Sequence, residues 1–399
     1  MNALVLGLGG TVDYEIDWDS EVLEALIEEY GILDRELDAT VPVDSERALV
    51  VTLLAFVKLG AGGERFVASS GIVERFASRF DKRITLGGTC VRAAMAMQVL
   101  GLSSTVHLVS IDDHVRGLLP SGIDYLCSAD HDTTDPHLIV QYPQGATVRA
   151  GDIELVSSGP NRIIYANDPP NRELVLADEL GGTLSMADVF MVSGFNVIQD
   201  AQTLAKRLEQ LGEHMRQLPA GATVIYEDAG YHVPLLNLQV RDALVGSVDV
   251  HSMNEDELQG YLGRRLDLLD ADEMSAALRE IHTEIPAPVL VIHTRYWALA
   301  LGDRARAFEA ALRGGIIMAG TRYRHGDVWS RSDHDTVAAM EPHSGGADFS
   351  RRLHALMGAG VVCVPALDIP ARVPTTIGLG DTFVGGFVAA LAGARPGDN

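Results

Sequence analysis

The sequence predicts an α/β protein with a central, mostly parallel sheet flanked by helices and a smaller, β-rich lid domain. Short apolar runs rich in β-branched residues alternate with amphipathic helical patterns along most of the chain, as expected where helices connect parallel strands. Residues 130–175 differ, because they carry turn residues and short strands without long helical patterns. With 399 residues, 47% of them hydrophobic, the chain can form one large domain and a smaller one.

The apolar pattern predicts the elements in chain order. Residues 3–10 form a buried strand that runs into a glycine turn, and helical patterns follow later strands, as at residues 201–218 and 255–266. Further strands are expected at residues 105–110, 137–142, 189–193, 223–227, 245–250, 289–293 and 360–365. We expect the large domain to comprise residues 1–12, 43–61, 87–129 and 176–399, and the lid residues 13–42, 62–86 and 130–175.

Charge and cysteine content limit the partners and the compartment. The formal net charge of −24 argues against nucleic acid or an anionic membrane as a partner. No run reaches the roughly 18 apolar residues of a membrane helix. No basic segment precedes an apolar one at the N-terminus, so we expect no signal peptide. Three widely spaced cysteines fit neither a disulfide framework nor a metal cluster, which favours the reducing cytoplasm.

The most informative motif lies near the end of the chain, at residues 375–383. Gly378 and Gly380 flank Leu379, Asp381 follows at once, and a small, apolar, helix-like run comes next. Bare backbone N–H groups and the positive end of a helix create an anion site. A carboxylate beside such a site can accept a proton from an attacking hydroxyl group, which suits phosphoryl transfer to an alcohol. The alternative is a glycine-rich loop whose aspartate caps a helix.

This motif resembles the Gly-x-Gly-Asp signature of the ribokinase-like superfamily. Further segments are similar, in the same order along the chain, to one branch of it, the ADP-dependent sugar kinases (glucokinase and 6-phosphofructokinase). These segments lie at residues 137–145, 161–164, 193–195 and 251–258, and the similarity extends in patches from about residue 7 to residue 390. The resemblance implies a ribokinase-like fold with a lid, ADP as phosphoryl donor, a sugar or sugar phosphate as acceptor, and Mg²⁺ as cofactor.

For the glycine motif, the resemblance implies catalysis. Asp381 would be the general base that accepts the proton of the sugar hydroxyl group as its oxygen attacks the terminal phosphoryl group. The backbone N–H groups of Gly378, Leu379 and Gly380 would hold the charge that develops, with Gly378 also near the nucleotide. Arg372, just before the motif, could reach the nucleotide phosphates or could be a loop surface charge.

Two acidic residues are candidates for the metal. Asn254 and Glu257 match the Asn-x-x-Glu motif of the family, which implies that Asn254 lies near the nucleotide and that Glu257 orients Mg²⁺ through water. A helix N-terminus capped by Asn254 explains the same residues, and both interpretations can hold. Glu227 matches the Glu of a His-x-Glu motif, whose Glu also serves the metal, but Ile225 stands at the His position.

Two segments are implied to contact the sugar. Asp13 matches an Asn-x-Asp pattern in which Thr11 replaces the Asn, and the alternative is an ordinary turn aspartate. Gly87, Gly88 and Thr89 resemble the Gly-Gly element whose backbone approaches the sugar, although glycines also suit a turn from strand to helix.

Several lone side chains complete the sugar side. His137 either faces the substrate or is structural, and Arg162 is a candidate phosphate clamp because its planar fork suits oxyanions. Glu64 would contact a sugar hydroxyl group, as a lid glutamate does in glucokinase members. Arg92 could meet a sugar phosphate or could be a solvated or paired surface residue. The histidines at strand ends without a metal-ligand partner at useful spacing, His251 and His293, are interpreted as structural.

The predicted function is phosphoryl transfer from ADP to a hydroxyl group of glucose or fructose 6-phosphate. No residue separates ADP from ATP on physical grounds, so an ATP-dependent ribokinase-like sugar or nucleoside kinase is one alternative. A non-catalytic sugar- or nucleotide-binding regulator is the alternative from another class. The departures at Thr11 and Ile225 support it, and the intact residues 378–381 oppose it. The oligomeric state stays open, since an exposed lid edge could pair with another subunit.

Overall fold

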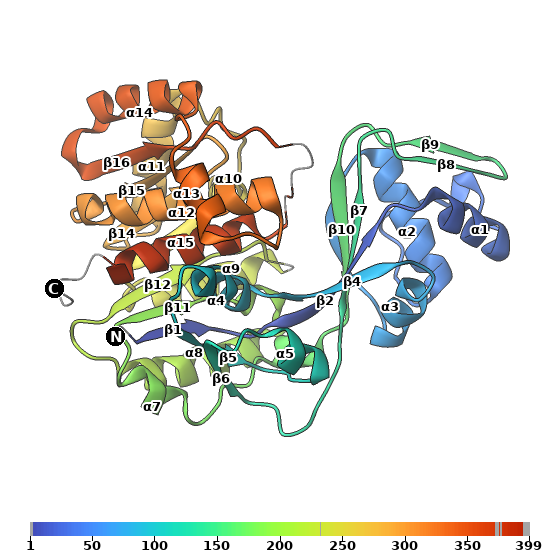
Figure 1. Cartoon of the computed structure of the whole chain (residues 1–399), viewed down its shortest axis with the longest axis horizontal. Helices are drawn as coiled ribbons and strands as arrows, with labels where there is room; N and C mark the ends of the chain where they lie inside the picture. The colour runs from blue at the N-terminus through green and yellow to red at the C-terminus, as the bar shows by residue number, and fades with distance from the viewer. Residues whose placement is uncertain (1–2, 232, 372–374, 376, 394–399) are drawn as a thin grey trace.

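The computed structural model describes residues 3–231, 233–371, 375 and 377–393, which form a large body and a smaller lobe (Figure 1). The strands of the body's sheet are β1 (Leu4–Gly7), β5 (Ser104–Leu108), β6 (Ile123–Cys127), β11 (Val189–Val192), β12 (Thr223–Glu227), β13 (Val250–Asn254), β14 (Val289–His293), β15 (Trp297–Leu301) and β16 (Val361–Pro365). Their order is β16-β15-β14-β13-β12-β11-β1-β5-β6. Strands from β6 to β14 pair in parallel, and β15 is antiparallel to both its neighbours. The predicted fold class is confirmed.

Helices cover both faces of this sheet (Figure 1). In β1, Leu4 and Leu6 belong to a core shared with the helices of one face, whereas Val5 packs with those of the other. The first face carries α4 (Thr89–Val99), α12 (Glu309–His325) and α15 (Leu379–Gly393). The second carries α7 (Leu180–Leu184), α8 (Ala201–Met215), α9 (Pro234–Leu244), α10 (Glu255–Leu262), α11 (Ala271–Glu284) and α14 (Ser344–Met357). Shorter elements are α5 (Asp113–Leu118), α6 (Pro169–Glu173), α13 (Arg331–Ala338) and the 3₁₀ turns Asp34–Glu36, Phe195–Val197, Ala305–Phe308 and Gly358–Gly360.

The smaller lobe is built on a second, mixed sheet. Its strands are β2 (Thr11–Asp17), β3 (Gly63–Phe66), β4 (Lys82–Gly87), β7 (His137–Tyr142) and β10 (Asn161–Ala166), in the order β3-β10-β7-β2-β4. One face is covered by α1 (Ser20–Tyr30), α2 (Glu46–Leu59) and α3 (Ser70–Ala77), and the hairpin of β8 (Thr147–Ala150) and β9 (Ile153–Val156) packs beside α1 and α2. In the part of the chain described, no helix is both long and apolar enough to cross a membrane.

The structure places residues 43–61 differently from the expectation that they belong to the large domain. They contain α2, which packs against α1, α3 and β9 of the smaller lobe. The Thr52 hydroxyl shares a hydrogen bond of 2.9 Å with the Tyr165 hydroxyl of β10. The apolar face of α2 therefore covers the small sheet, because Leu49 and Leu53 are fully buried there.

The strand expected at residues 245–250 is wrong in its position. The helix α9 runs to Leu244, and a turn follows in which the Ser247 N–H donates to the Leu244 carbonyl group at 2.8 Å. Gly246 and Ser247 are turn-forming residues, and β13 begins only at Val250. The apolar Val245 that suggested a strand instead packs against a helical core.

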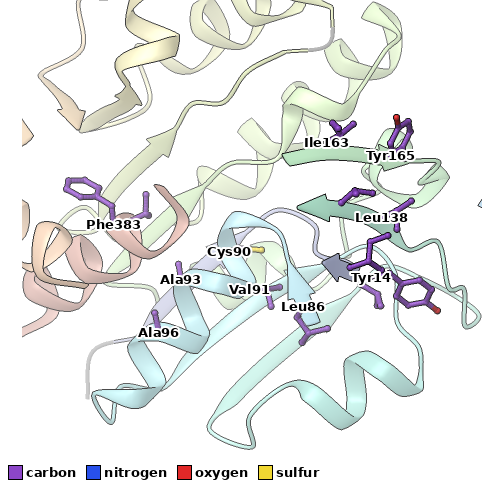
Figure 2. Close-up of a cluster of buried hydrophobic side chains, with 14 of the residues drawn as sticks. Tyr14, Leu86, Cys90, Val91, Ala93, Ala96, Leu138, Ile163, Tyr165 and Phe383 are labelled. Atoms are coloured by element: carbon purple, nitrogen blue, oxygen red, sulfur yellow. The ribbon is translucent and has the colours of Figure 1, made fainter. Parts of the chain in front are cut away.

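The helix α15 is held unusually close to its neighbours. A Cβ atom at Gly386 would overlap with the backbone of Gly314 in α12, so the two helix backbones meet without side chains between them. The core continues from there into the smaller lobe: Figure 2 shows buried side chains that extend from Phe383 of α15, past Cys90 of α4, to Leu138 of the small sheet. One apolar core therefore connects the beginning of α15 to both sheets.

We expect the buried His107 of β5 to make folding sensitive to acid. Burial lowers its pKa to about 4, and its Nε2 accepts a hydrogen bond from the Ala177 N–H at 2.9 Å. The unfolded chain binds this proton near the ordinary pKa of 6.5, so stability falls as pH decreases from about 6.5 to about 4. The loss should be about 2–3 kcal/mol between pH 7 and pH 4.5. His107→Gln should flatten this dependence in urea unfolding, whereas an unchanged slope would contradict the assignment.

Candidate active site

A cavity of about 1240 Å³ lies between the two sheets. The carboxyl ends of β12, β13 and β14 lead into it, which is where ligands bind in open α/β sheets. The open face of the small sheet forms the opposite wall. The predicted residues that line the cavity are Asp13, Glu64, Gly88, Thr89, His137, Arg162, Glu227, Asn254, Glu257, Gly378, Leu379, Gly380 and Asp381. Gly87 lies outside this lining and pairs with Thr11 between β4 and β2, and Arg372 lies outside the described residues.

The glycine motif forms the N-terminal turn of α15. Gly378 has φ = 66°, in the left-handed region, and its carbonyl group accepts hydrogen bonds from the Thr382 N–H (3.0 Å) and hydroxyl group (2.8 Å). Asp381 lies in the first turn, where the Thr89 hydroxyl group of α4 donates to Oδ1 at 2.9 Å. The Asp381 side chain keeps 24% of its surface exposed. The turn therefore presents a carboxylate and the positive end of a helix to the cavity.

The register of the small sheet places the predicted sugar-facing residues on one face. Asp13 pairs with His137 between β2 and β7, and Glu64 pairs with Ile164 between β3 and β10. Arg162 precedes Ile164 by two residues, so its side chain leaves the strand on the same side. All five side chains line the cavity. The structure thus brings Asp13, His137, Arg162 and Glu64 together on one wall.

His137 contributes positive charge to this wall. Burial by itself would lower the pKa of His137, but the hydrogen bond and the charge of Asp168 outweigh it and raise the pKa above the ordinary value. The His137 Nε2 and Asp168 Oδ2 atoms are 3.0 Å apart. Asp168 also caps α6, and its Oδ1 accepts from the Asn171 N–H at 3.0 Å. Sequence reasoning missed Asp168, although an aspartate before Pro169 is typical of a helix start.

Three arginines lie along the same wall. Arg162 on β10 and Arg172 on α6 line the cavity, and within the described ranges neither makes an ion pair with a carboxylate. Arg65 is already engaged, because its Nη2 donates to the Val41 carbonyl group at 2.7 Å. Arg172 was not predicted from the sequence. Two half-buried guanidinium groups are thus available to an anionic group bound on this wall.

Arg92 is neither a surface residue nor a free clamp. It lines the cavity from α4 but is only 5% exposed, and its Nη2 contacts Asp13 Oδ2 at 2.7 Å. The Thr11 hydroxyl group donates to the other Asp13 oxygen at 2.7 Å. Asp13 is therefore a buried, paired carboxylate rather than an ordinary turn residue.

The opposite end of the cavity carries two acids, the buried Glu227 and the half-buried Glu257. Glu227 ends β12, and its Oε2 is buried without a hydrogen-bond partner in the described structure. The Glu257 carboxylate accepts from the N–H (2.6 Å) and side-chain amide (2.8 Å) of Asn254, so the capping interpretation of this segment holds. Burial raises the pKa of Glu257 to about 8, with further contributions from the charges of Asp228 and Glu227. Such a carboxylate pair with an unsatisfied oxygen fits a divalent cation.

The two histidines interpreted as structural differ in position. His251 is fully buried within β13, with its Nε2 3.4 Å from Asp228 Oδ2. His293 lines the cavity: its Nε2 lies 3.0 Å from Glu227 Oε1, and its ring stacks on Phe383 with centroids 4.4 Å apart. The histidine absent at Ile225 is thus supplied to Glu227 from β14, which lies two strands away from β12 in the sheet. Among the described residues, no three acidic, histidine or cysteine side chains have the geometry of an all-protein metal site.

Comparisons with known proteins agree on the family and the architecture. The family model described as "ADP-specific Phosphofructokinase/Glucokinase conserved region" matches residues 2–388. A phosphofructokinase from Pyrococcus horikoshii OT3, solved with AMP, superimposes with a TM-score of 0.78 at 17% sequence identity, covering 98% of this chain and 97% of that one. The comparison with curated protein sequences gives no match.

Two further solved structures share the fold. A reconstructed last common ancestor of ADP-dependent phosphofructokinases from Methanosarcinales has a TM-score of 0.74 at 13% identity and covers 100% of this chain and 95% of its own. An ADP-dependent kinase in complex with fructose-6-phosphate and ADPβS has a TM-score of 0.72 at 13% identity, with coverage of 99% and 94%. At these identities the likeness establishes the fold.

The two motif glycines should respond differently to alanine. An alanine at position 378 would have a strained left-handed φ, and its Cβ atom would lie 2.9 Å from Arg92 Cδ. Gly378→Ala should therefore lose about 2 kcal/mol of unfolding free energy. At Gly380 the nearest atom, His293 Cε1, is 3.7 Å away, and alanine favours the helix, so Gly380→Ala should be neutral or up to about 1 kcal/mol more stable. Urea unfolding measures both, and equal effects would contradict the described turn.

Proposed function

Because the chain belongs to the ADP-specific phosphofructokinase/glucokinase family, we propose that Asp381 and its N-terminal turn transfer the terminal phosphoryl group of ADP to a sugar phosphate. The protein is an ADP-dependent sugar kinase of the ribokinase-like fold, which acts on nucleotide and sugar substrates. Because this family is ADP-specific, its match favours ADP as the phosphoryl donor over the alternative of an ATP-dependent kinase. The identity of the general base, of the metal ion and of the preferred acceptor is our proposal.

One observation carries the assignment of the base. Asp381 occupies the first turn of α15, faces the cavity and is oriented by the Thr89 hydroxyl group at 2.9 Å. In the proposed reaction the acceptor oxygen forms a bond to the terminal phosphorus of ADP as the bond from that phosphorus to the AMP oxygen breaks. The proton of the acceptor hydroxyl group moves to Asp381. The backbone N–H groups of residues 378–380 and the helix dipole stabilise the charge on the phosphoryl oxygens.

Glu227 and Glu257 are the residues that would hold Mg²⁺. The orphaned Glu227 Oε2 and the raised pKa of Glu257 support this choice, because both disfavour a buried site without a cation. When bound, Mg²⁺ would neutralise part of the diphosphate charge. His293 holds the other oxygen of Glu227 and so orients it. Asn254 fixes Glu257 by two hydrogen bonds. This contact supports the proposed position of Asn254 close to the nucleotide.

The arginines favour a sugar phosphate such as fructose 6-phosphate over glucose. Arg162 and Arg172 lie on the same wall as Asp13 and His137 without carboxylate partners in the described structure, and planar guanidinium groups suit phosphate oxygens. Glu64 faces the same cavity and would contact a hydroxyl group. Asp13, Gly88 and Thr89 would contact the sugar ring beside Asp381.

We further propose that residues 13–86 and 130–175 form the lid, with residues 43–61 included because α2 covers the small sheet. Acceptor contacts from Asp13, His137 and Arg162 would favour closure over the body and exclude water, which competes as a phosphoryl acceptor. A cytoplasmic location is also a proposal, supported by three free cysteines.

The Asp381→Asn variant should show whether Asp381 acts as a general base or only as a helix cap. Asparagine caps helices as well as aspartate does, so a purely structural role would leave turnover intact. We expect turnover of ADP with fructose 6-phosphate to fall about 10³-fold, with the affinity for ADP measured by calorimetry nearly unchanged. The control is Asp270→Asn at the N-cap of α11, which should keep full turnover. Near-normal turnover of Asp381→Asn would remove this residue from the mechanism.

Arg162→Gln and Arg172→Gln should each raise KM for fructose 6-phosphate about 10- to 100-fold, because each removes a charged hydrogen bond to the phosphate. KM for ADP should not change, and neither should any turnover of glucose, which lacks the phosphate. Arg149→Gln on the exposed hairpin serves as the lid control, since the Arg149 guanidinium group pairs with Glu154 at 3.2 Å, away from the cavity lining. Equal losses with glucose and fructose 6-phosphate would rule out a phosphate clamp.

A further inference from the structure

The guanidinium group of Arg92 connects the sugar-facing wall to Asp381. Nη2 contacts Asp13 Oδ2 at 2.7 Å, Nε lies 3.8 Å from Asp381 Oδ2, and Nη1 lies 3.8 Å from Asp327 Oδ1. The three nitrogens of one rigid, planar group thus face carboxylates from β2, α15 and the segment after α12. The side chain is only 5% exposed, so water screens these interactions weakly.

The stem of Arg92 also supports the glycine turn. The position of a Cβ atom at Gly378 lies 2.9 Å from Arg92 Cδ, so the turn rests on the methylene groups of the arginine. A second arginine holds the same turn: Arg322 Nε donates to the Ile377 carbonyl group at 2.6 Å, and its Nη1 bonds Asp327 at 2.6 Å. The two arginines share Asp327 and together fix where α15 begins.

Four titratable groups face Asp381 and its turn. They are Arg92 and Cys90 on α4, Arg322 on α12, and His293 on β14 beside Gly380. Burial raises the pKa of Cys90 to about 12, so this thiol stays neutral. Burial would lower the pKa of Arg92, but the charges of Asp13 and Asp381 raise it. Arg92 is therefore a permanent cation beside Asp381, at the same time bound to the carboxylate that faces the sugar.

We propose that Arg92 is a positioning residue that orients Asp381 for proton acceptance and ties that orientation to Asp13 on the sugar side. The inference rests on the proposed function, because it requires Asp381 to act as the base. Arg92 itself touches neither the acceptor nor ADP in this scheme. Its loss should therefore slow the chemical step while leaving the affinity for ADP nearly unchanged.

The test compares Arg92→Lys and Arg92→Gln in single-turnover phosphoryl transfer from ADP to fructose 6-phosphate, with the affinity for ADP measured by calorimetry beside it. A single ammonium group cannot contact Asp13 and Asp381 together, so Arg92→Lys should slow transfer about tenfold. Arg92→Gln removes the cation, so transfer should slow about 100-fold, with the affinity for ADP nearly unchanged in both variants. Should Arg92→Gln fail to fold, the rate of Arg92→Lys decides.

Arg207 offers a matched control. It is a buried arginine on α8, 7% exposed, whose Nε donates to the Glu173 carbonyl group at 2.7 Å. Arg207→Lys and Arg207→Gln should reduce stability but keep the transfer rate. An active wild-type enzyme with an unchanged transfer rate in the Arg92 variants would overturn this inference alone. A wild-type enzyme without turnover would overturn the proposed function and this inference with it.

Discussion

The close contact of α15 with its neighbours is the constraint on which the site depends. Where Gly386 meets Gly314, no side chain separates the helix backbones, so α15 has one depth at which it can pack. Its first turn then ends at the cavity, closed by Thr382 on the Gly378 carbonyl group. The space left beneath the turn is filled by the stems of Arg92 and Arg322. Helix packing therefore sets the position of Asp381 at the edge of the cavity.

Although the net charge of the chain is −24, cationic side chains gather on one wall of the cavity. One wall carries His137, Arg162 and Arg172, and Arg92 lies beneath the turn at residues 377–381. The opposite end has the reverse balance, since the buried Glu227 and the half-buried Glu257 interact there. An anionic ligand is attracted by this local arrangement and not by the overall charge, which is why an acidic protein can bind phosphorylated substrates.

The sequence predicted what is written locally. Strands 137–142, 223–227 and 289–293 each contain a run of apolar residues and match the structure. The turn at residues 378–381 is indicated by its two glycines. The sequence could not show which sheet α2 covers, because the apolar face of a helix does not specify the surface against which it packs. Asp168, Arg172 and His293 were missed or misinterpreted for a related reason. His293 meets Glu227 across 66 positions, and Asp168 meets His137 across 31, so only the fold makes them partners.

The positions of the cavity-lining residues along the small sheet bear on how the acceptor preference of such an enzyme can change during evolution. Arg162 on β10 and Arg172 on α6 line the cavity, and in the described structure neither pairs with Asp13 or Asp381. If these arginines bind the acceptor as we propose, selection can exchange them one at a time and alter acceptor preference without displacing Asp381. Asp13 has no such freedom, since it shares Arg92 with Asp381. Enzymes of this architecture should therefore vary in sequence at β10 and α6 and retain the aspartate on β2.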